Sequence, residues 1–132
     1  MINVIFQFNA DDLIESMSIS GHANFADSGS DIICASASTL LYTTINALED
    51  LCGLTGFYQI REGSKKFKEP DAKITIPPEV MDKGRDTPTY WIMSMARIGF
   101  ITMENTDKEE YGNQHIKVTE KHGKHFGGVR ND

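Results

Sequence analysis

The sequence lacks long hydrophobic runs and a surplus of positive charge. No apolar stretch approaches the roughly 20 residues that a helix needs to cross a bilayer, so we expect no membrane partner. The 13 Lys and Arg residues are outnumbered by 19 Asp and Glu residues, which gives a formal net charge of −6. A general nucleic-acid binder needs excess basic residues to neutralise phosphates, and we therefore expect no direct nucleic-acid partner.

Cysteine is also scarce, with only Cys34 and Cys52 in the chain. Both lie in a segment with the pattern of one helix, in which the 18 positions between them would span about 27 Å. A disulfide needs Cα atoms within about 7 Å, so we expect two free thiols, which suits a reducing compartment. The first residues, MINVIFQFNADD, lack the basic start of a signal peptide, and we expect a cytoplasmic protein.

Patterns that would hold a metal ion or a nucleotide are missing too. His115, His122 and His125 do not combine with one free cysteine into the tightly spaced ligand set of a zinc site. No glycine-rich phosphate loop follows a predicted strand. We therefore expect neither a metal nor a cofactor.

What is present fits one globular domain. The chain has 132 residues, of which 39% are hydrophobic and 24% are charged. Alternating apolar residues predict strands at 2–8, 16–22, 56–62, 71–77 and 113–121. Apolar residues at helical spacing predict helices at 32–52 and 88–105. The order ββαββαβ indicates an α+β fold, in which two helices pack on one face of a mostly antiparallel sheet.

Each predicted helix has a start signal and an apolar face. Asp31 is a suitable N-cap for the first helix, and Thr87 with Pro88 after it marks the start of the second. The first helix is expected to bury Ile33, Ala37, Leu40, Thr44, Leu48 and Leu51. The second is expected to bury Trp91, Ile92, Met95, Ile98 and Thr102. We expect residues 1–121 to form the domain and 122–132 to form a flexible tail.

One segment, GHANFADSGSDIICASAS from Gly21 to Ser38, holds residue types used in nucleophilic catalysis. His22 ends a predicted strand, and Cys34 would be the third residue of the first helix. The unpaired N–H groups and partial positive charge of a helix N-terminus favour a thiolate, and a nearby imidazolium favours it further. The pattern fits a Cys–His pair, in which the thiolate attacks and the imidazolium protonates the leaving group.

The same residues also have structural interpretations. A free cysteine such as Cys34 often packs as a small buried hydrophobe, and a single histidine is often a surface residue. Cys52, in line with Leu48, fits core packing. Ser38, one helical turn after Cys34, could steer a thiolate or bond to its own helix, and Asp31 fits a helix cap better than a third catalytic residue.

The segment resembles the signature of the Prp family, the ribosomal-processing cysteine proteases of bacteria. The matching positions are Gly21, His22, Ala23, Phe25, Gly29, Asp31, Ile32, Cys34, Ala35 and Ser38. INALE at 45–49 continues the match, and NQHIKVTEK at 113–121 is similar, more loosely, to the family's last strand.

The resemblance implies a homodimeric α+β endopeptidase without a cofactor. Family members remove a short N-terminal extension from the large-subunit ribosomal protein numbered twenty-seven, so the implied partner is a ribosomal protein precursor as substrate. The family's catalytic pair falls on Cys34 and His22. Asp31 and Ser38 match supporting positions beside that pair.

A substrate loop is expected between the second strand and the first helix. The family match places Gly21, Phe25 and Gly29 in or beside it, and we expect residues 23–30 to move and to close on a bound peptide. Two other functions remain open from the sequence. One is a ribosome-assembly module that binds without cleaving, and the other is a redox sensor, which the lack of a nearby resolving cysteine disfavours.

Overall fold

The computed structural model describes residues 1–21, 28–61 and 71–123. The elements in these ranges are β1 (Ile2–Phe8), β2 (Ile14–Ser20), α1 (Ser28–Cys52), β3 (Tyr58–Arg61), β4 (Asp71–Thr75), α2 (Pro78–Met81), α3 (Pro88–Glu110) and β5 (Ile116–His122). The predicted ββαββαβ order is confirmed, and α2 adds one short turn of helix after β4. Of the predicted tail, residues 124–132 lie outside the described ranges.

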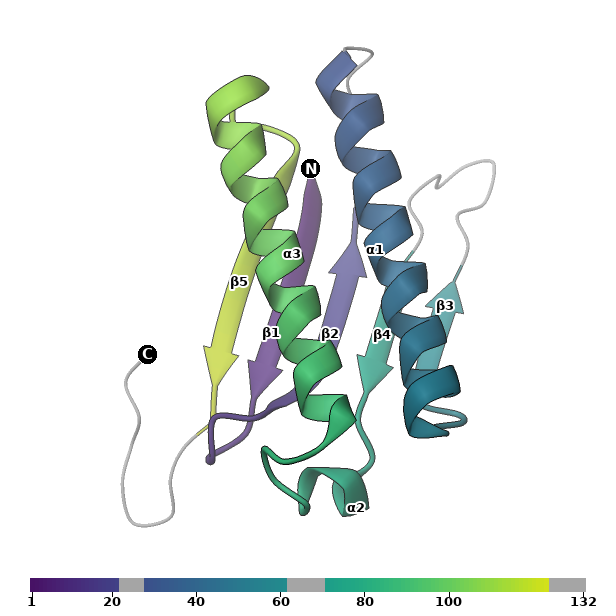
Figure 1. Cartoon of the computed structure of the whole chain (residues 1–132). Helices are drawn as coiled ribbons and strands as arrows, with labels where there is room; N and C mark the ends of the chain where they lie inside the picture. Colours follow the sequence, from purple (N-terminus) through teal and green to yellow (C-terminus); the bar gives the residue numbers. More distant parts are fainter. Residues whose placement is uncertain (22–27, 62–70, 124–132) are drawn as a thin grey trace.

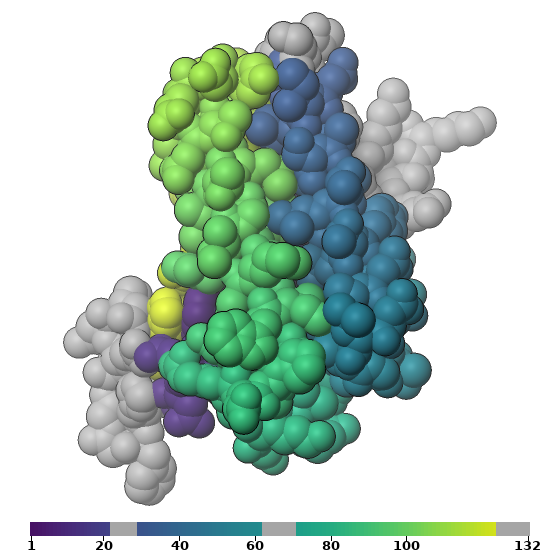
Figure 2. Space-filling view, in the orientation of Figure 1, coloured from purple at the N-terminus to yellow at the C-terminus, as the bar shows by residue number. Residues whose placement is uncertain are grey.

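The strands form one sheet in the order β3-β4-β2-β1-β5. Its neighbouring strands are antiparallel except for β1 and β5, which run parallel. A parallel pair needs a long crossover between its strands, and here the chain between β1 and β5 passes through the helical layer. Figure 1 shows α1 and α3 side by side across one face of the sheet, and their side chains meet along that layer in Figure 2. The α+β arrangement predicted from the sequence is confirmed.

The core lies between this helical layer and the sheet. Strand alternation turns one row of β1 toward the helices, so that Val4 and Phe6 are fully buried, as is Met17 on β2. Phe6 faces Phe100 of α3 across the layers, with ring centroids 6.2 Å apart. Full burial of each such side chain contributes about 1.5–3 kcal/mol, so this interface carries much of the folding free energy.

Helix α1 starts earlier than the sequence predicted. It begins at Ser28, so Asp31 lies in its first turn and is not the N-cap. Cys34 is consequently the seventh helical residue, counted from Ser28, rather than the third. The prediction was wrong because Ser and Gly at positions 28–30 have low intrinsic helix propensity, whereas packing of that turn against α3 overrides the propensity.

The buried face of α1 follows the prediction as far as its last turn. Ile33, Ala37, Thr44 and Leu48 are buried as expected, but Leu51 is 70% exposed. Leu40 is partly buried against the other helix, where a Cβ added to Gly99 would lie 2.6 Å from Leu40 Cδ2. The absence of a side chain at Gly99 therefore lets α1 and α3 approach closely.

The start of α3 was predicted correctly, but its end and its buried face were not. The Thr87 hydroxyl accepts a hydrogen bond from the Tyr90 N–H, Pro88 is the first helical residue, and the helix runs to Glu110. The predicted face is mostly exposed, with exposed fractions of 66%, 51% and 61% for Trp91, Met95 and Ile98.

Another apolar row of α3 faces the core in place of the predicted one. Ile92, which was predicted, is buried together with Met93, Ala96 and Phe100, whereas Thr102 is exposed. The first half of α3 carries apolar residues around most of its circumference, so helical spacing alone did not select the buried side.

Asp107 and His115 form a buried polar connection between α3 and β5. Their exposed fractions are 0% and 1%. Asp107 Oδ2 accepts hydrogen bonds from the backbone N–H groups of His115 (2.9 Å) and Ile116 (3.2 Å), and Oδ1 lies 2.6 Å from His115 Nδ1. The carboxylate can only accept, so Nδ1 donates. The Ile2 N–H then donates to the His115 carbonyl at 2.8 Å, which extends the connection to β1.

Burial alone would raise the pKa of Asp107. Hydrogen bonds from the His115 side chain and from the His115 and Ile116 backbone outweigh that effect, so the pKa of this carboxyl is lowered from its ordinary value. The folded state, in which three donors bond to Asp107, therefore favours the ionised form of this carboxyl more strongly than the unfolded chain does.

We expect Asp107→Asn to lower the free energy of unfolding by about 2 kcal/mol or more at neutral pH, because the amide turns a donor toward groups that already donate. The folded-state pKa of Asp107 lies below the unfolded value of about 3.9. Its contribution is thus fully present above that value and is lost as pH falls through the folded pKa. Urea unfolding at several pH values checks this expectation.

The matched control is Asp86→Asn, at an exposed position before α3. It should change the unfolding free energy little at any pH. An Asp107→Asn protein as stable as the unmodified chain at neutral pH would contradict the structural role assigned to this carboxylate.

Candidate active site around Cys34

Cys34 lines a pocket between α1 and the sheet. The pocket has a volume of about 320 Å³, and its other lining residues are Ile2, Ile19, Gly21, Ala37, Ser38, Leu41, Tyr42, Ile60 and Ala72. The thiol is free and partly buried, and the side chain also packs against the core. Cys34 thus stands at the boundary between packed interior and open space, where a thiol can meet a ligand.

The helical repeat explains why Cys34 and Ser38 share this pocket. Residues one turn apart lie on the same face of a helix, and Ser38 follows Cys34 by four positions. Leu41, one turn further, also lines the pocket. The structure therefore brings two of the predicted site residues together, and packing of Ile33 beside them fixes the direction in which α1 presents them.

Gly21 joins the pocket from the end of β2 and has no room for a side chain. Its φ is +86°, and a Cβ would lie 2.3 Å from the Met1 carbonyl oxygen. That carbonyl is held in place because the next residue, Ile2, is bonded to His115 in the sheet. Only glycine fits this position, which precedes His22 directly.

Gly29 and Asp31 lie away from the pocket lining. Gly29 is the second residue of α1, and a Cβ there would lie 2.8 Å from Tyr111 Cβ. Its role in the structure is close packing of the α1 start on the end of α3. Residues 28–30 of the predicted loop are therefore helical, and Asp31 is exposed in the first turn of α1.

His22 and Phe25 lie outside the described residues, as does the rest of the predicted loop at 23–27. The Cys34–His22 pair stays a prediction.

The sequence also predicted that the N-terminus of α1 would stabilise the Cys34 thiolate, and the position of Cys34 in the helix shows that this prediction was wrong. Because Cys34 is in the second turn of α1, its amide has a carbonyl four residues earlier within the helix, and the effect of the helix dipole falls off beyond the first turn.

The second cysteine has a different environment. Cys52 is the last residue of α1, is partly buried against the core, and does not line the Cys34 pocket. Both cysteines are free, as predicted. Both side chains pack partly against the core, and Cys34 alone of the two also lines this pocket.

Within the described ranges, no cluster of three or more His, Cys, Asp or Glu side chains could hold a metal ion. In the same ranges, no helix has the length and apolar character needed to span a membrane. His115 is bonded to Asp107, and His122 stacks on Phe8 with ring centroids 4.4 Å apart.

Comparison with known proteins decides the family. The sequence model of the family described as cysteine protease Prp matches residues 1–113. The chain belongs to the cysteine protease Prp family. It is therefore a cysteine protease, and the resemblance found in the segment Gly21–Ser38 is confirmed for most of the chain.

Individual Prp relatives and structures agree with this assignment. The ribosomal processing cysteine protease Prp of Bacillus subtilis (strain 168) is 31% identical over 100 residues, which cover 74% of this chain and 87% of that protein. The Prp structure from S. aureus with a substrate peptide has a TM-score of 0.63 at 25% identity and covers 92% of this chain and all of that one (100%). SMU.848 from Streptococcus mutans shares the fold, with a TM-score of 0.73 at 24% identity over 92% of this chain and 95% of that one.

Sequence reasoning did not find most of this Prp pocket. Ile2, Ile19, Ile60 and Ala72 come from four different strands. They come together because the strand order is β3-β4-β2-β1. This order places β4 beside β2, although α1 and β3 separate these two strands along the chain. Each of these residues fits the ordinary apolar pattern of a strand, so no local signal in the sequence marks it as part of a site.

We expect Gly21→Ala to destabilise this Prp-family protein and to lower its peptidase activity. The new methyl group would collide with the Met1 carbonyl, and the relief of that collision would shift the backbone beside His22. Gly53→Ala is the matched control, because Gly53 also has a positive φ (+66°) but nothing within 4 Å of its added Cβ.

Gly53→Ala should cost about 1 kcal/mol for the backbone conformation alone. Gly21→Ala should cost about 1–3 kcal/mol more, because it adds a steric collision to the same strain. Urea unfolding and peptide turnover measure the two effects. Equal losses in both variants would contradict a specific close approach at Gly21.

Proposed function

We propose that this Prp-family chain is a ribosomal-processing endopeptidase that uses Cys34 as nucleophile and His22 as its acid–base partner. One observation supports the choice of Cys34 above all. Of the two cysteines, Cys34 lines an open pocket together with Gly21, the residue before His22, whereas Cys52 packs at the far end of α1. The proposed protease domain is residues 1–121.

The proposed reaction has two steps. The Cys34 thiolate attacks the scissile carbonyl carbon, and the peptide C–N bond breaks as His22 gives its proton to the departing amine. Neutral His22 then takes a proton from a water molecule as the water oxygen attacks the thioester carbon. The C–S bond breaks, and the carboxylate product and the Cys34 thiol are released. This chemistry needs no cofactor.

The pocket lining supports selection of an apolar side chain beside the scissile bond. Ile2, Ile19, Leu41 and Ile60 supply aliphatic walls, and burial of a matching side chain there would stabilise the complex by about 1.5–3 kcal/mol. Ser38 is the polar group of the pocket nearest in sequence to Cys34. We assign its hydroxyl to a supporting hydrogen bond with the substrate backbone.

Asp31 supports the site indirectly in this proposal. Its carboxylate lies in the first turn of α1, where a negative charge interacts favourably with the helix N-terminus by about 0.3–1 kcal/mol. It therefore stabilises the turn that precedes Cys34. Gly21, Phe25 and Gly29 are proposed to shape the segment that meets the substrate.

The proposed substrate is the precursor of the large-subunit ribosomal protein numbered twenty-seven, cleaved in the cytoplasm at the end of its N-terminal extension. The B. subtilis relative is named a ribosomal processing protease. The S. aureus structures hold a substrate peptide in one case and a covalently linked product peptide in the other. A covalent product is what a thiol nucleophile leaves behind.

We expect this protein to cut a synthetic peptide that spans the extension junction at one bond. Cys34→Ala should abolish the cut, because no thiolate remains to form the thioester, whereas Cys52→Ala should preserve most of it. Mass spectrometry of the products, with far-ultraviolet circular dichroism of both variants, measures this. Cleavage by Cys34→Ala, or an intact peptide that nevertheless binds the unmodified protein, would contradict the proposal and favour a binding module.

We also propose that the protein is a homodimer. Trp91, Met95 and Ile98 form an exposed apolar stripe on α3, and large exposed apolar patches are typical of interaction sites. Met95→Glu should shift the molecular mass measured by analytical ultracentrifugation from dimer to monomer, because it places a charge in the stripe. Thr55→Glu, at an exposed position in the loop between α1 and β3, should leave the dimer intact, and a monomeric unmodified protein would contradict the proposal.

A further inference from the structure

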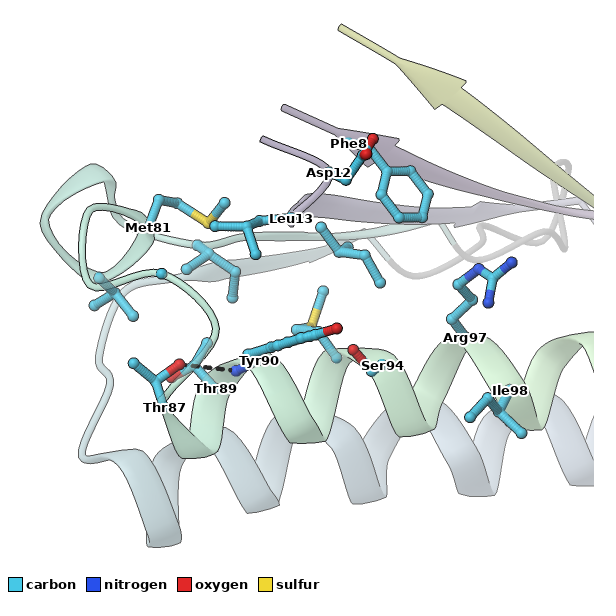
Figure 3. A pocket seen from close by; sticks show the side chains of 15 residues that line it. Phe8, Asp12, Leu13, Met81, Thr87, Thr89, Tyr90, Ser94, Arg97 and Ile98 are labelled. Carbon is cyan, nitrogen blue, oxygen red and sulfur yellow. Dashed lines mark hydrogen bonds between the residues drawn. The ribbon is translucent and has the colours of Figure 1, made fainter. Parts of the chain in front are cut away.

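A second pocket lies at the opposite end of the sheet from Cys34. Its volume is about 280 Å³, and it lies between α3, the short helix α2 and the turn that joins β1 to β2 (Figure 3). The two pockets share no lining residue. Ile2 lines the Cys34 pocket and Phe8 lines this one, so the length of β1 separates them by about 20 Å.

The floor of this second pocket is apolar and belongs to the core. Leu13, Ile76 and Met93 are 7%, 3% and 1% exposed, and all three line it. Val80 and Met81 of α2 add an apolar side wall. Methionine side chains adapt to ligands of different outline, so the floor suits a compact branched or aromatic group about the size of one amino-acid side chain.

The α3 wall carries hydrogen-bond donors in one row. Tyr90, Ser94 and Arg97 are four and three residues apart, which places them on one face of the helix. Figure 3 shows all three on the side of α3 that faces the sheet. The Tyr90 hydroxyl accepts from Arg85 Nη1 at 2.8 Å, and its own proton is therefore available to a ligand.

Arg97 has unused donors at this wall. Its Nε donates to Glu120, and its two terminal nitrogens make no hydrogen bond with any residue of the described ranges. The guanidinium lies 6.0 Å from the centroid of the Phe8 ring, at the edge of the pocket. A guanidinium presents its terminal N–H groups as a planar fork that matches the two oxygens of a carboxylate.

Other charged side chains at the opening of this second pocket lie close to partners. Asp12 Oδ1 lies 3.6 Å from His122 Nδ1, and Glu120 faces Arg97. Arg85 lies over the Tyr90 ring, 5.3 Å from its centroid. Two guanidinium groups thus flank the donor row, and the nearby carboxylates already face cationic or imidazole partners.

We propose that this pocket binds a carboxylate carried on a small apolar body. The carboxylate would bond to the Arg97 fork and to the Ser94 and Tyr90 hydroxyls, and the apolar body would cover Leu13 and Met93. Such a group occurs at the C-terminus of a peptide that ends in an apolar residue, and also in a free acid of the same shape. The site is separate from the Cys34 chemistry and does not depend on it.

The single tryptophan of the chain provides a direct readout. Trp91 stacks on Tyr90 with centroids 5.5 Å apart and an interplanar angle of 15°. Titration with N-acetyl-leucine should give a saturable change in Trp91 fluorescence. N-acetyl-leucinamide, which has the same body without the charge, should bind about tenfold or more weakly because the charge-assisted bonds to Arg97 are lost.

Two variants and one control locate the binding. Ser94→Phe should abolish the response by filling the pocket, and Arg97→Lys should weaken binding about tenfold, because a point charge replaces the fork. Thr55→Phe, at an exposed loop position that lines neither pocket, should bind as the unmodified protein does. Peptide cleavage should be unchanged in all three, since the pocket is distant from Cys34.

A pentapeptide, Ala-Ala-Gly-Ala-Leu with a free C-terminus, distinguishes the two sources of the ligand. Tighter binding of this peptide than of N-acetyl-leucine supports the proposal and assigns the site to peptide C-termini, whereas binding of the acid alone supports it and assigns the site to free acids. The proposal is overturned by any of three results: no saturable response to N-acetyl-leucine, equal affinity for the amide, or unchanged affinity in Arg97→Lys.

Discussion

Packing of α1 against the sheet determines where the chemistry of this protein can occur. Ile33, Ala37 and Leu48 are buried in that interface, so the helix cannot rotate about its axis without exposing them. Cys34 follows Ile33 directly and is turned to the edge of the same interface, where α1 and four strands leave a pocket. One buried helical row therefore fixes both the stability of the domain and the direction of its proposed nucleophile.

The segment that carries His22 begins and ends at close-packed glycines. Before it, Gly21 lies against the Met1 carbonyl, and after it, Gly29 lies against Tyr111. Tyr111 caps α3, whose Asp107 is bonded to His115 and thereby to the strand that pairs with β1. A buried carboxylate far from Cys34 in sequence thus stabilises the parts of α3 and β1 on which the two glycines pack.

Local signals in the sequence predicted the fold well where periodicity and caps agree. Strand β1 was predicted at its observed bounds, and Thr87 with Pro88 marked the start of α3. Local signals failed where packing decides. The first turn of α1 has poor helix formers but packs on α3, and α3 has apolar residues on both its buried and its exposed sides. At the site, the motif predicted Cys34 and Ser38, whereas the pocket walls depend on strand order.

A covalent role for Cys34 is central to the proposed function, and trapping the acyl-enzyme tests this role most directly. A junction peptide is mixed with the protein, the reaction is quenched in acid at short times, and the protein is digested and mapped by mass spectrometry. We expect a transient adduct, with the mass of the N-terminal peptide fragment less water, on Cys34 alone. An adduct on Cys52, or cleavage at an undiminished rate by Cys34→Ala, would contradict it.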